Sequence, residues 1–266
     1  MTLLEAIILG IVQGLTEFLP VSSSGHIEIA QAILGMQSLS EREEALSVFL
    51  HGGTALSTIF VFRKDISELV SGIFSASWNR EKKFAILIVI SMIPAGLAGL
   101  FLDEYISGLF DGKVGLTGAM LLVTSVLLWF ADKAGSPQMN VNPGKALIIG
   151  IAQMIAILPG ISRSGATIST SLLLRIDRNQ AARFSFLMVV PLIVGKMLLD
   201  LMDEAESGFA AWDGIMIPLA AGFGASFLTG ILACRWMLLL VQRSQLRYFG
   251  LYCLIVGFIA LFWTFF

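Results

Sequence analysis

The chain has 266 residues, of which 56% are hydrophobic and only 14% charged, and its mean hydropathy is +0.86. The recurrence of long apolar runs in such a composition predicts an integral membrane protein. A net charge of −2, with no basic tract interleaved with aromatic residues, excludes nucleic acid as the expected partner. Two cysteines are too few for a disulfide framework, and we expect both to pack as small apolar side chains.

Six apolar runs approach the roughly 20 helical residues needed to cross about 30 Å of hydrocarbon. They cover residues 46–62, 84–102, 114–130, 184–199, 215–240 and 249–266. They predict an all-α integral membrane fold with six full spans, in a single membrane domain over residues 1–266. Shorter helical segments precede these spans in two pairs, 3–18 with 26–34 and 146–158 with 165–174.

An internal repeat emerges when the chain is aligned with itself at an offset of 140 residues. Gln13 then meets Gln153, and the Ser-x-Ser-Gly pattern at 22–25 meets the same pattern at 162–165. These polar matches occur at the same offset as several apolar matches. The apolar matches alone would be weak evidence for a repeat in so hydrophobic a chain. The repeat predicts a first unit over 1–140 and a second over 141–266.

Each unit begins with a helical pair that is too short to span a membrane, since the first helix of the second pair reaches only about 20 Å. We therefore expect a re-entrant helical hairpin whose polar tip is buried in protein, where non-helical backbone is tolerated. Three spans follow each hairpin. Because three is an odd number, the second unit enters from the opposite side, which makes an inverted-topology repeat.

Basic residues set the expected orientation, because Lys and Arg are enriched in loops on the inner side of a membrane. With the N-terminus outside, the inner loops hold thirteen of the 17 basic residues. These are Arg63, Lys64, Arg80, Lys82, Lys83, Lys133, Lys145, Arg175, Arg178, Arg183, Arg235, Arg243 and Arg247. Both termini are then predicted to lie outside, and the two hairpin tips to meet near the midplane from opposite sides.

The second tip contains Arg163, an arginine between two apolar runs. A charge at that depth costs roughly 2.5 to 3.5 kcal/mol on insertion scales, and arginine cannot lose its proton, so we expect it to hold an anion. Around it lie Gly160, the hydroxyls of Ser162, Ser164 and Thr167, and Gly165, where a backbone can approach a ligand closely. Together with a helix N-terminus, these groups predict a phosphate-binding site.

The first tip supplies groups that can carry out acid–base and nucleophilic chemistry. Gln13 and Glu17 are four residues apart and share a helix face, while Ser23 and His26 follow the break at Pro20. The candidate nucleophiles are Ser23 activated by Glu17 or by His26, His26 itself, or a positioned water. We favour Ser23 with His26 as its proton partner. Glu17, Ser23, His26 and Arg163 are thus the predicted catalytic residues.

Three further residues of the first tip have predicted roles. Ser24 and Gly25 are expected to help bind the substrate phosphate, as their counterparts in the second tip do. Ser22 is expected to be a helix cap only, because serines commonly cap helices after a break.

The two motifs closely resemble the signatures of the bacterial undecaprenyl-pyrophosphate phosphatase family, also called the bacitracin-resistance protein family. Its first signature is Glu or Gln, three residues, Glu, then Pro-Val-Ser-Ser-(Ser/Thr)-Gly-His, and residues 13–26 match it. Its second signature, Pro-Gly-x-Ser-Arg-Ser-x-x-Thr, is matched by residues 159–167. The similarity covers essentially the whole chain, including its length and the positions of both motifs.

The resemblance implies hydrolysis of undecaprenyl (C55) pyrophosphate to undecaprenyl phosphate and inorganic phosphate, which regenerates the lipid carrier for peptidoglycan synthesis. It implies a multi-pass protein of the bacterial cytoplasmic (inner) membrane, surrounded by membrane lipids, with a site reachable from the periplasmic side. It implies resistance to bacitracin, which sequesters the substrate, and it is compatible with either a monomer or a homodimer. A divalent cation, Mg²⁺ or Ca²⁺, is also implied, with Glu17 and Gln13 as expected ligands. Many family members have glutamate at the position of Gln13, so a site with two carboxylate ligands is in question here.

A different class of protein fits part of this pattern. Inverted repeats with broken helices meeting at the midplane are typical of secondary transporters, and a polyprenyl-lipid flippase with a midplane anion site would share them. Such a site requires groups that hold a ligand, but not Glu17, Ser23 and His26 together beside Arg163. The content of the tips therefore favours the phosphatase.

Overall fold

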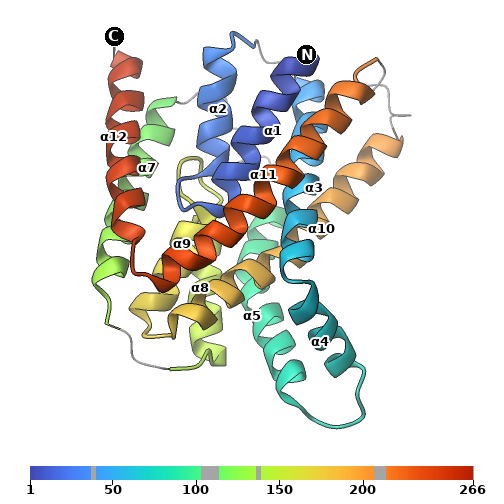
Figure 1. Ribbon diagram of the computed structural model, residues 1–266, viewed down its shortest axis with the longest axis vertical. Coiled ribbons are helices and arrows are strands. Elements are labelled where there is room, and N and C mark those ends of the chain that lie inside the picture. Colours follow the sequence, from blue (N-terminus) through green and yellow to red (C-terminus); the bar gives the residue numbers. More distant parts are fainter. Residues whose placement is uncertain (37–39, 103–113, 136–138, 207–213, 266) are drawn as a thin grey trace.

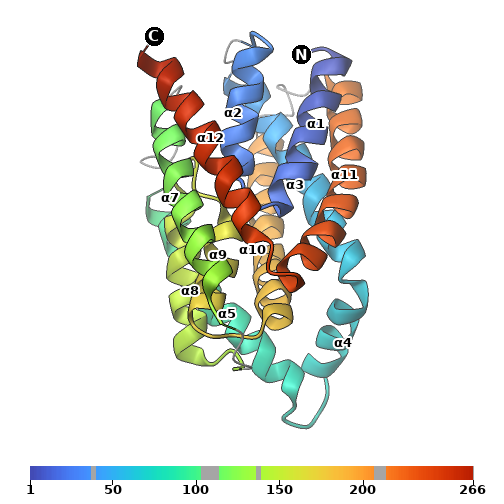
Figure 2. The ribbon, with the colours of Figure 1, turned by 60° about the vertical axis from the view of Figure 1, so that its left-hand side comes forward.

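A computed structural model describes residues 1–36, 40–102, 114–135, 139–206 and 214–265, and within these ranges the chain forms helices and no β-strand (Figures 1 and 2). The helices are α1 (Leu3–Phe18), α2 (Ser23–Ile33), α3 (Ser40–Val61), α4 (Arg63–Ile73), α5 (Arg80–Phe101), α7 (Val114–Lys133), α8 (Pro143–Ile155), α9 (Arg163–Leu173), α10 (Arg178–Glu206), α11 (Met216–Gln242) and α12 (Leu246–Phe265). This confirms the all-helical class that the apolar runs predict.

Several helices begin at a side chain that satisfies the otherwise unpaired N–H groups of a first turn. Thr2 caps α1 in a reciprocal capping box with Glu5. Asn79 caps α5, and Asn142 caps α8 just before Pro143, whose missing N–H costs nothing at that position.

Five of the described helices, α5, α7, α10, α11 and α12, are long and apolar enough to cross a membrane. The remaining predicted span, 46–62, falls in α3, whose apolar part ends at a bend of 78° into α4. By length and composition, the described residues thus provide five candidate spans, or six if the bent pair α3–α4 counts as one. The α8 helix is apolar but short, as the hairpin prediction requires.

Close packing at two helix crossings explains why glycine occurs at two matching positions of the repeat, Gly10 and Gly150. The α1 helix packs along α11, and α8 packs along α5. A Cβ atom on Gly10 would lie 2.4 Å from the carbonyl oxygen of Gly222, and one on Gly150 would lie 2.4 Å from that of Ser91. Gly10 and Gly150 are therefore both glycines because each lies where two helix backbones touch.

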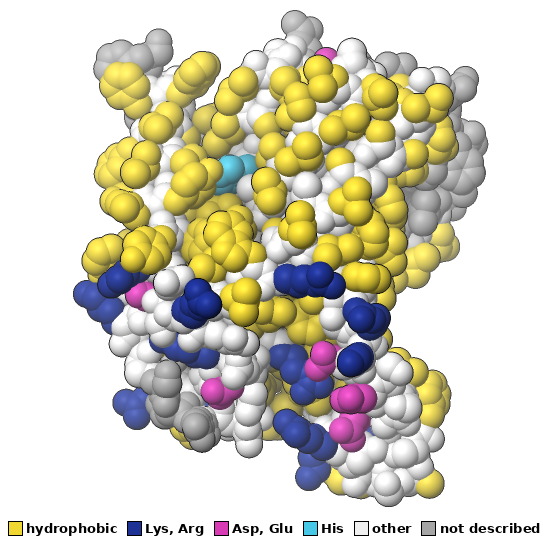
Figure 3. All heavy atoms as spheres, in the orientation of Figure 1, with side chains coloured by type: hydrophobic (Ala, Val, Ile, Leu, Met, Phe, Trp, Pro, Cys, Tyr) yellow, Lys and Arg dark blue, Asp and Glu magenta, His cyan; other side chains and the backbone are white. Residues whose placement is uncertain are grey.

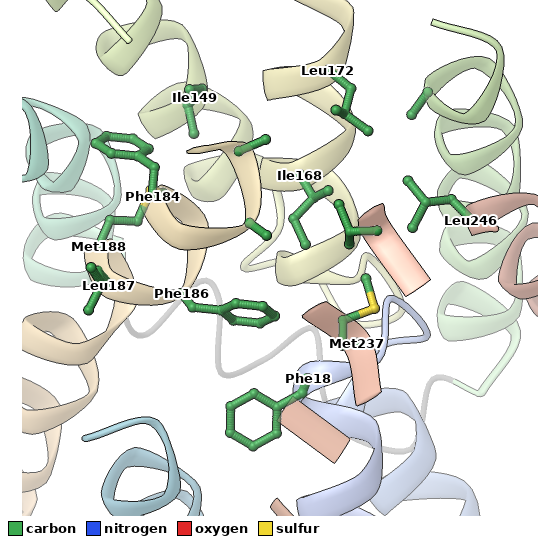
Figure 4. Close-up of a cluster of buried hydrophobic side chains, with 14 of the residues drawn as sticks. Phe18, Ile149, Ile168, Leu172, Phe184, Phe186, Leu187, Met188, Met237 and Leu246 are labelled. Carbon is green, nitrogen blue, oxygen red and sulfur yellow. The ribbon is translucent and has the colours of Figure 1, made fainter. Parts of the chain in front are cut away.

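The largest cluster of buried apolar side chains lies where α1 and α7 to α12 come together (Figure 4). Phe18 at the end of α1 faces Phe186 of α10, with ring centroids 5.9 Å apart. Both predicted packing cysteines, Cys234 and Cys253, are fully buried in this cluster. The cluster supports the polar tips, because Phe18 directly follows Glu17 in the chain.

Charged side chains are unevenly distributed along the long axis of the molecule. On the face drawn in Figure 3, Lys and Arg gather in the half that contains α4, while the half nearer both termini is largely apolar (Figures 1 and 3). On this face the protein therefore has one basic end, opposite the end that carries the N- and C-termini.

Candidate functional site

The two helical hairpins, α1–α2 and α8–α9, have tips with matching caps. Ser22 caps α2, with its Oγ accepting a hydrogen bond from the backbone N–H of Gly25 at 3.4 Å. Ser162 caps α9 in the same way, accepting from the N–H of Gly165 at 3.1 Å. The cap predicted for Ser22 is confirmed. Ser162, which was expected to bind phosphate, has the same capping geometry because it occupies the equivalent repeat position.

The tips touch each other. Ser164 Oγ donates a hydrogen bond to the backbone carbonyl of Leu19 at 3.1 Å, which links the second tip to the first. A Cβ atom on Gly25 would lie 3.7 Å from Gly160 Cα, an ordinary van der Waals contact between the two loops. Gly160 has φ of +91°, a left-handed conformation that favours glycine. Both glycines face Thr117 of α7, since an added Cβ would lie 2.8 Å from its Cγ2 at Gly25 and 2.3 Å from its carbonyl oxygen at Gly160, so they allow the two loops to pack closely against α7.

Glu17 connects the functional groups of both tips. Its Oε2 accepts hydrogen bonds from Gln13 Nε2 at 3.0 Å and from Ser23 Oγ at 2.6 Å. Its Oε1 accepts from the guanidinium of Arg163, with which it forms an ion pair. Glu17 is only 9% exposed, so this carboxylate is buried but fully paired. The predicted convergence of Gln13, Glu17, Ser23 and Arg163 is thus observed in the geometry.

His26 faces a different neighbour from the one we expected. Its Nδ1 lies 2.7 Å from the carbonyl oxygen of Ser22, and its Nε2 lies 2.8 Å from the hydroxyl of Tyr252 on α12. The two rings stack with centroids 5.6 Å apart. Because a carbonyl only accepts, Nδ1 carries the hydrogen, and in the neutral ring Nε2 accepts from Tyr252. Both ring nitrogens of His26 thus have other partners, and Ser23 is hydrogen-bonded to Glu17 instead. The favoured pairing of Ser23 with His26 is not found.

Sequence reasoning missed Tyr252, because it lies in an apolar run that we assigned only to membrane crossing. The available signal was weak: it is one of only three tyrosines in the chain, and it lies 226 residues away from His26.

A small cavity lies between the tips, α3 and α10. Its lining residues are Glu17, Phe18, Thr54, Thr58, Arg163, Ser164, Thr167, Ser185, Phe186, Val189 and Ile193. Four of the predicted site residues line it: Glu17, Arg163, Ser164 and Thr167. Thr54, Thr58 and Ser185 were not predicted, because no motif marks them in their apolar runs.

The α7 helix holds the second tip in place. The backbone N–H of Ser162 donates to Thr124 Oγ1 at 3.1 Å, and the same hydroxyl lies 3.1 Å from the carbonyl oxygen of Gly160, to which it donates. Thr124 is 1% exposed, so this contact is made away from water. The loop that leads into Arg163 is therefore held against α7 by two hydrogen bonds to Thr124.

The residues at the tips do not form a metal site by themselves. Glu17 has both of its oxygens committed to protein donors, and Gln13 presents its amide nitrogen to Glu17. Across the described part of the chain, no three His, Cys, Asp or Glu side chains gather into a cluster that could hold a metal ion. A cation at this site would need most of its oxygen ligands from elsewhere.

Comparison with known proteins identifies relatives over almost the full length of the chain. An undecaprenyl-diphosphatase of Christiangramia forsetii is 53% identical over 261 residues, which cover 98% of each chain. Undecaprenyl-diphosphatases of Parabacteroides distasonis and Korarchaeum cryptofilum are 43% and 40% identical, with 98% and 97% of each chain covered. The sequence model of bacitracin resistance protein BacA matches residues 6–259. With both signatures gathered at one buried carboxylate, the chain belongs to the BacA family of bacitracin resistance proteins.

Proposed function

We propose that the protein hydrolyses undecaprenyl pyrophosphate to undecaprenyl phosphate and inorganic phosphate. The proposal is supported by its family membership and by relatives named undecaprenyl-diphosphatase. The observation that carries it is the contact of Glu17 with both Ser23 and Arg163. That contact places a potential nucleophile, a base and a guanidinium at one point.

The chemistry of a phosphoanhydride matches these groups. The leaving lipid phosphate is a good leaving group, so the larger task is to stabilise negative charge in a partly dry site. Arg163 has five N–H donors, of which Glu17 engages only part, so the rest are available to phosphate oxygens. Ser23 loses its proton to Glu17 as its oxygen attacks the terminal phosphorus, and the bond from that phosphorus to the bridging oxygen breaks, so that undecaprenyl phosphate leaves. Water then hydrolyses the phosphate ester on Ser23 and releases inorganic phosphate. Glu17 therefore takes the role of proton acceptor that we first gave to His26.

We also propose the inverted repeat with two re-entrant hairpins, in the cytoplasmic membrane, with both termini outside. The packing of α1 on α11 and of its counterpart α8 on α5 supports the repeat, as do the matched caps of α2 and α9. The basic end opposite the termini supports the orientation. A site between two tips at the midplane would be reachable from the periplasmic side through the end near the termini.

A divalent cation, Mg²⁺ or Ca²⁺, is part of the proposal. Because the carboxylate of Glu17 is already paired, pyrophosphate oxygens would provide most of the ligands, as is common for Mg²⁺ bound with phosphates. Bound there, the cation would neutralise part of the pyrophosphate charge. The protein steps described above are carried by Glu17, Ser23 and Arg163.

The test is phosphate release from undecaprenyl pyrophosphate by detergent-purified protein, with Mg²⁺ or with a chelator. We expect metal-dependent release by the wild type and none by Arg163→Ala. Arg163→Lys should restore little, because a point charge does not reproduce a bidentate fork. Lys145→Ala, which removes a basic side chain at the start of α8, is the control and should keep full activity. No release by well-folded wild type would favour the transporter or flippase instead.

A further inference from the structure

The hydroxyl groups around the cavity differ in whether their hydrogen is already used. A hydroxyl has a single hydrogen to donate, and an anion can be bound only by donors. Thr54 donates to the carbonyl of His51 at 2.9 Å, and Thr58 donates to that of Thr54 at 3.1 Å. Both threonines of α3 therefore have their hydrogens committed to their own helix.

The hydroxyls of the second tip are committed as well. Thr167 Oγ1 donates to the carbonyl of Arg163 at 2.9 Å, and Ser164 Oγ donates to that of Leu19 at 3.1 Å. As they stand, these two residues of the family signature can only accept hydrogen bonds from a ligand. Their hydrogen bonds fix the conformation of the tip, and Arg163 is the side chain there that can donate hydrogen bonds to an anion.

Ser185 on α10 is the exception among the described residues that line the cavity. Its side chain is 4% exposed, and its Oγ has no hydrogen-bond partner among the described protein atoms. A buried hydroxyl left without a partner is unfavourable, so a native one needs an explanation. Ser185 lines the same cavity as Arg163 and Glu17, on the wall formed by α10.

We propose that Ser185 is a further substrate-binding residue, whose hydroxyl donates a hydrogen bond to a phosphate oxygen held by Arg163. The inference rests on the proposed function for the identity of the anion, which is the pyrophosphate group. Ser185 and Arg163 then hold the anion from two walls of the cavity, α10 and the second tip. A neutral donor opposite a guanidinium adds direction to the binding without adding charge.

Ser169 on α9 provides a matched control. Its Oγ is likewise buried and without a partner among the described atoms, and its side chain is fully buried, but it does not line the cavity. Replacing either serine with alanine removes an unsatisfied polar group, so neither variant should lower the melting temperature of the ligand-free protein. Only the loss of the Ser185 hydroxyl should weaken binding of the substrate.

The experiment compares wild type, Ser185→Ala, Ser185→Thr and Ser169→Ala in two assays. The first is the rate of phosphate release from undecaprenyl pyrophosphate. The second is the rise in melting temperature caused by inorganic pyrophosphate, which separates recognition of the anion from recognition of the lipid. We expect Ser185→Ala to lower kcat/KM roughly tenfold to hundredfold and to reduce the pyrophosphate-induced rise. Ser185→Thr, which keeps the donor, should retain more activity than Ser185→Ala, and Ser169→Ala should match the wild type.

Two results would overturn the inference: wild-type kinetics and pyrophosphate response in Ser185→Ala, or an equal loss in Ser169→Ala, which would show an effect on folding rather than on binding. Failure of the proposed function gives a different pattern. In that case the wild type releases no phosphate, and a pyrophosphate response that depends on Ser185 would still establish the anion site.

Discussion

Ser23 Oγ lies 2.6 Å from Glu17 Oε2, while the other oxygen of the same carboxylate pairs with Arg163. One side chain of the first hairpin therefore contacts the candidate nucleophile of its own tip and the anion-binding arginine of the other tip. Two segments about 140 residues apart in sequence are joined at a single buried charge.

If Ser23 and Glu17 act as one unit, their substitutions should not have independent effects. We expect Ser23→Ala and Glu17→Gln each to lower kcat by at least about 10²-fold, and the double variant to be little worse than either single one. Glu5→Gln, at the other acidic residue of α1, is the control, because Glu5 only completes the capping box with Thr2. If the fold losses in the rate of phosphate release of the two single variants multiply in the double variant, the two residues act separately.

The amide of Gln13 should determine how strongly the enzyme depends on a cation. Gln13→Glu would place a second carboxylate about 3 Å from Glu17, and two such charges require a cation or a proton between them. We expect the variant to remain active with Mg²⁺, but to lose activity more steeply than the wild type as Mg²⁺ is withdrawn. Phosphate release across a Mg²⁺ titration measures this, with Gln13→Asn as the neutral comparison. Identical titration curves for Gln13→Glu and wild type would contradict the prediction.

Tyr252 should orient the ring of His26. Tyr252→Phe keeps the stacked ring and deletes the hydroxyl that donates to Nε2, so we expect the free energy of unfolding to fall by about 1 kcal/mol, the worth of one neutral hydrogen bond. Tyr248→Phe, at an exposed tyrosine of the same helix, should have no effect.

A spectroscopic measurement can separate this role of Tyr252 from a general effect on structure. The chain has only two histidines, so ¹⁵N-histidine NMR of a His51→Gln background reports on His26 alone. Loss of the Tyr252 hydroxyl should shift the Nε2 resonance, with Nδ1 still protonated. An unchanged Nε2 resonance would mean that the hydroxyl and the ring do not interact in the protein.

The helix crossings at Gly10 and Gly150 should tolerate no side chain. Gly10→Ala and Gly150→Ala each place a methyl group within 2.4 Å of a backbone oxygen, so we expect each to lower the free energy of unfolding by about 1–3 kcal/mol. Gly96→Ala, in α5, would bring the added methyl within 4 Å of no atom of another helix, and it should be neutral or slightly stabilising. Denaturant unfolding in detergent measures all three, and an equal stability of the Gly10 and Gly96 variants would show that the α1–α11 crossing can relax.

Much of the fold follows from local patterns. Apolar runs of sufficient length predicted the spans, and short helical pairs predicted the α1–α2 and α8–α9 hairpins, because length and composition are properties of neighbouring residues. The bend of 78° after α3 was not predicted, since the apolar run continues through Phe62 and only the three-dimensional path of the chain shows where the helix turns.

The sequence by itself determined which residue types stand at the tips, since a buried arginine beside a carboxylate, serines and a histidine points to phosphate chemistry. The tertiary structure alone decided which of them contact each other: Ser23 bonds with Glu17 rather than His26, and Ser162 caps a helix. It also brought in Tyr252 and Ser185, from helices whose runs gave no functional signal. The physical reason is that caps and helix faces depend on residues within about four positions, whereas the partner of a hydroxyl or an imidazole depends on atoms from helices distant in sequence.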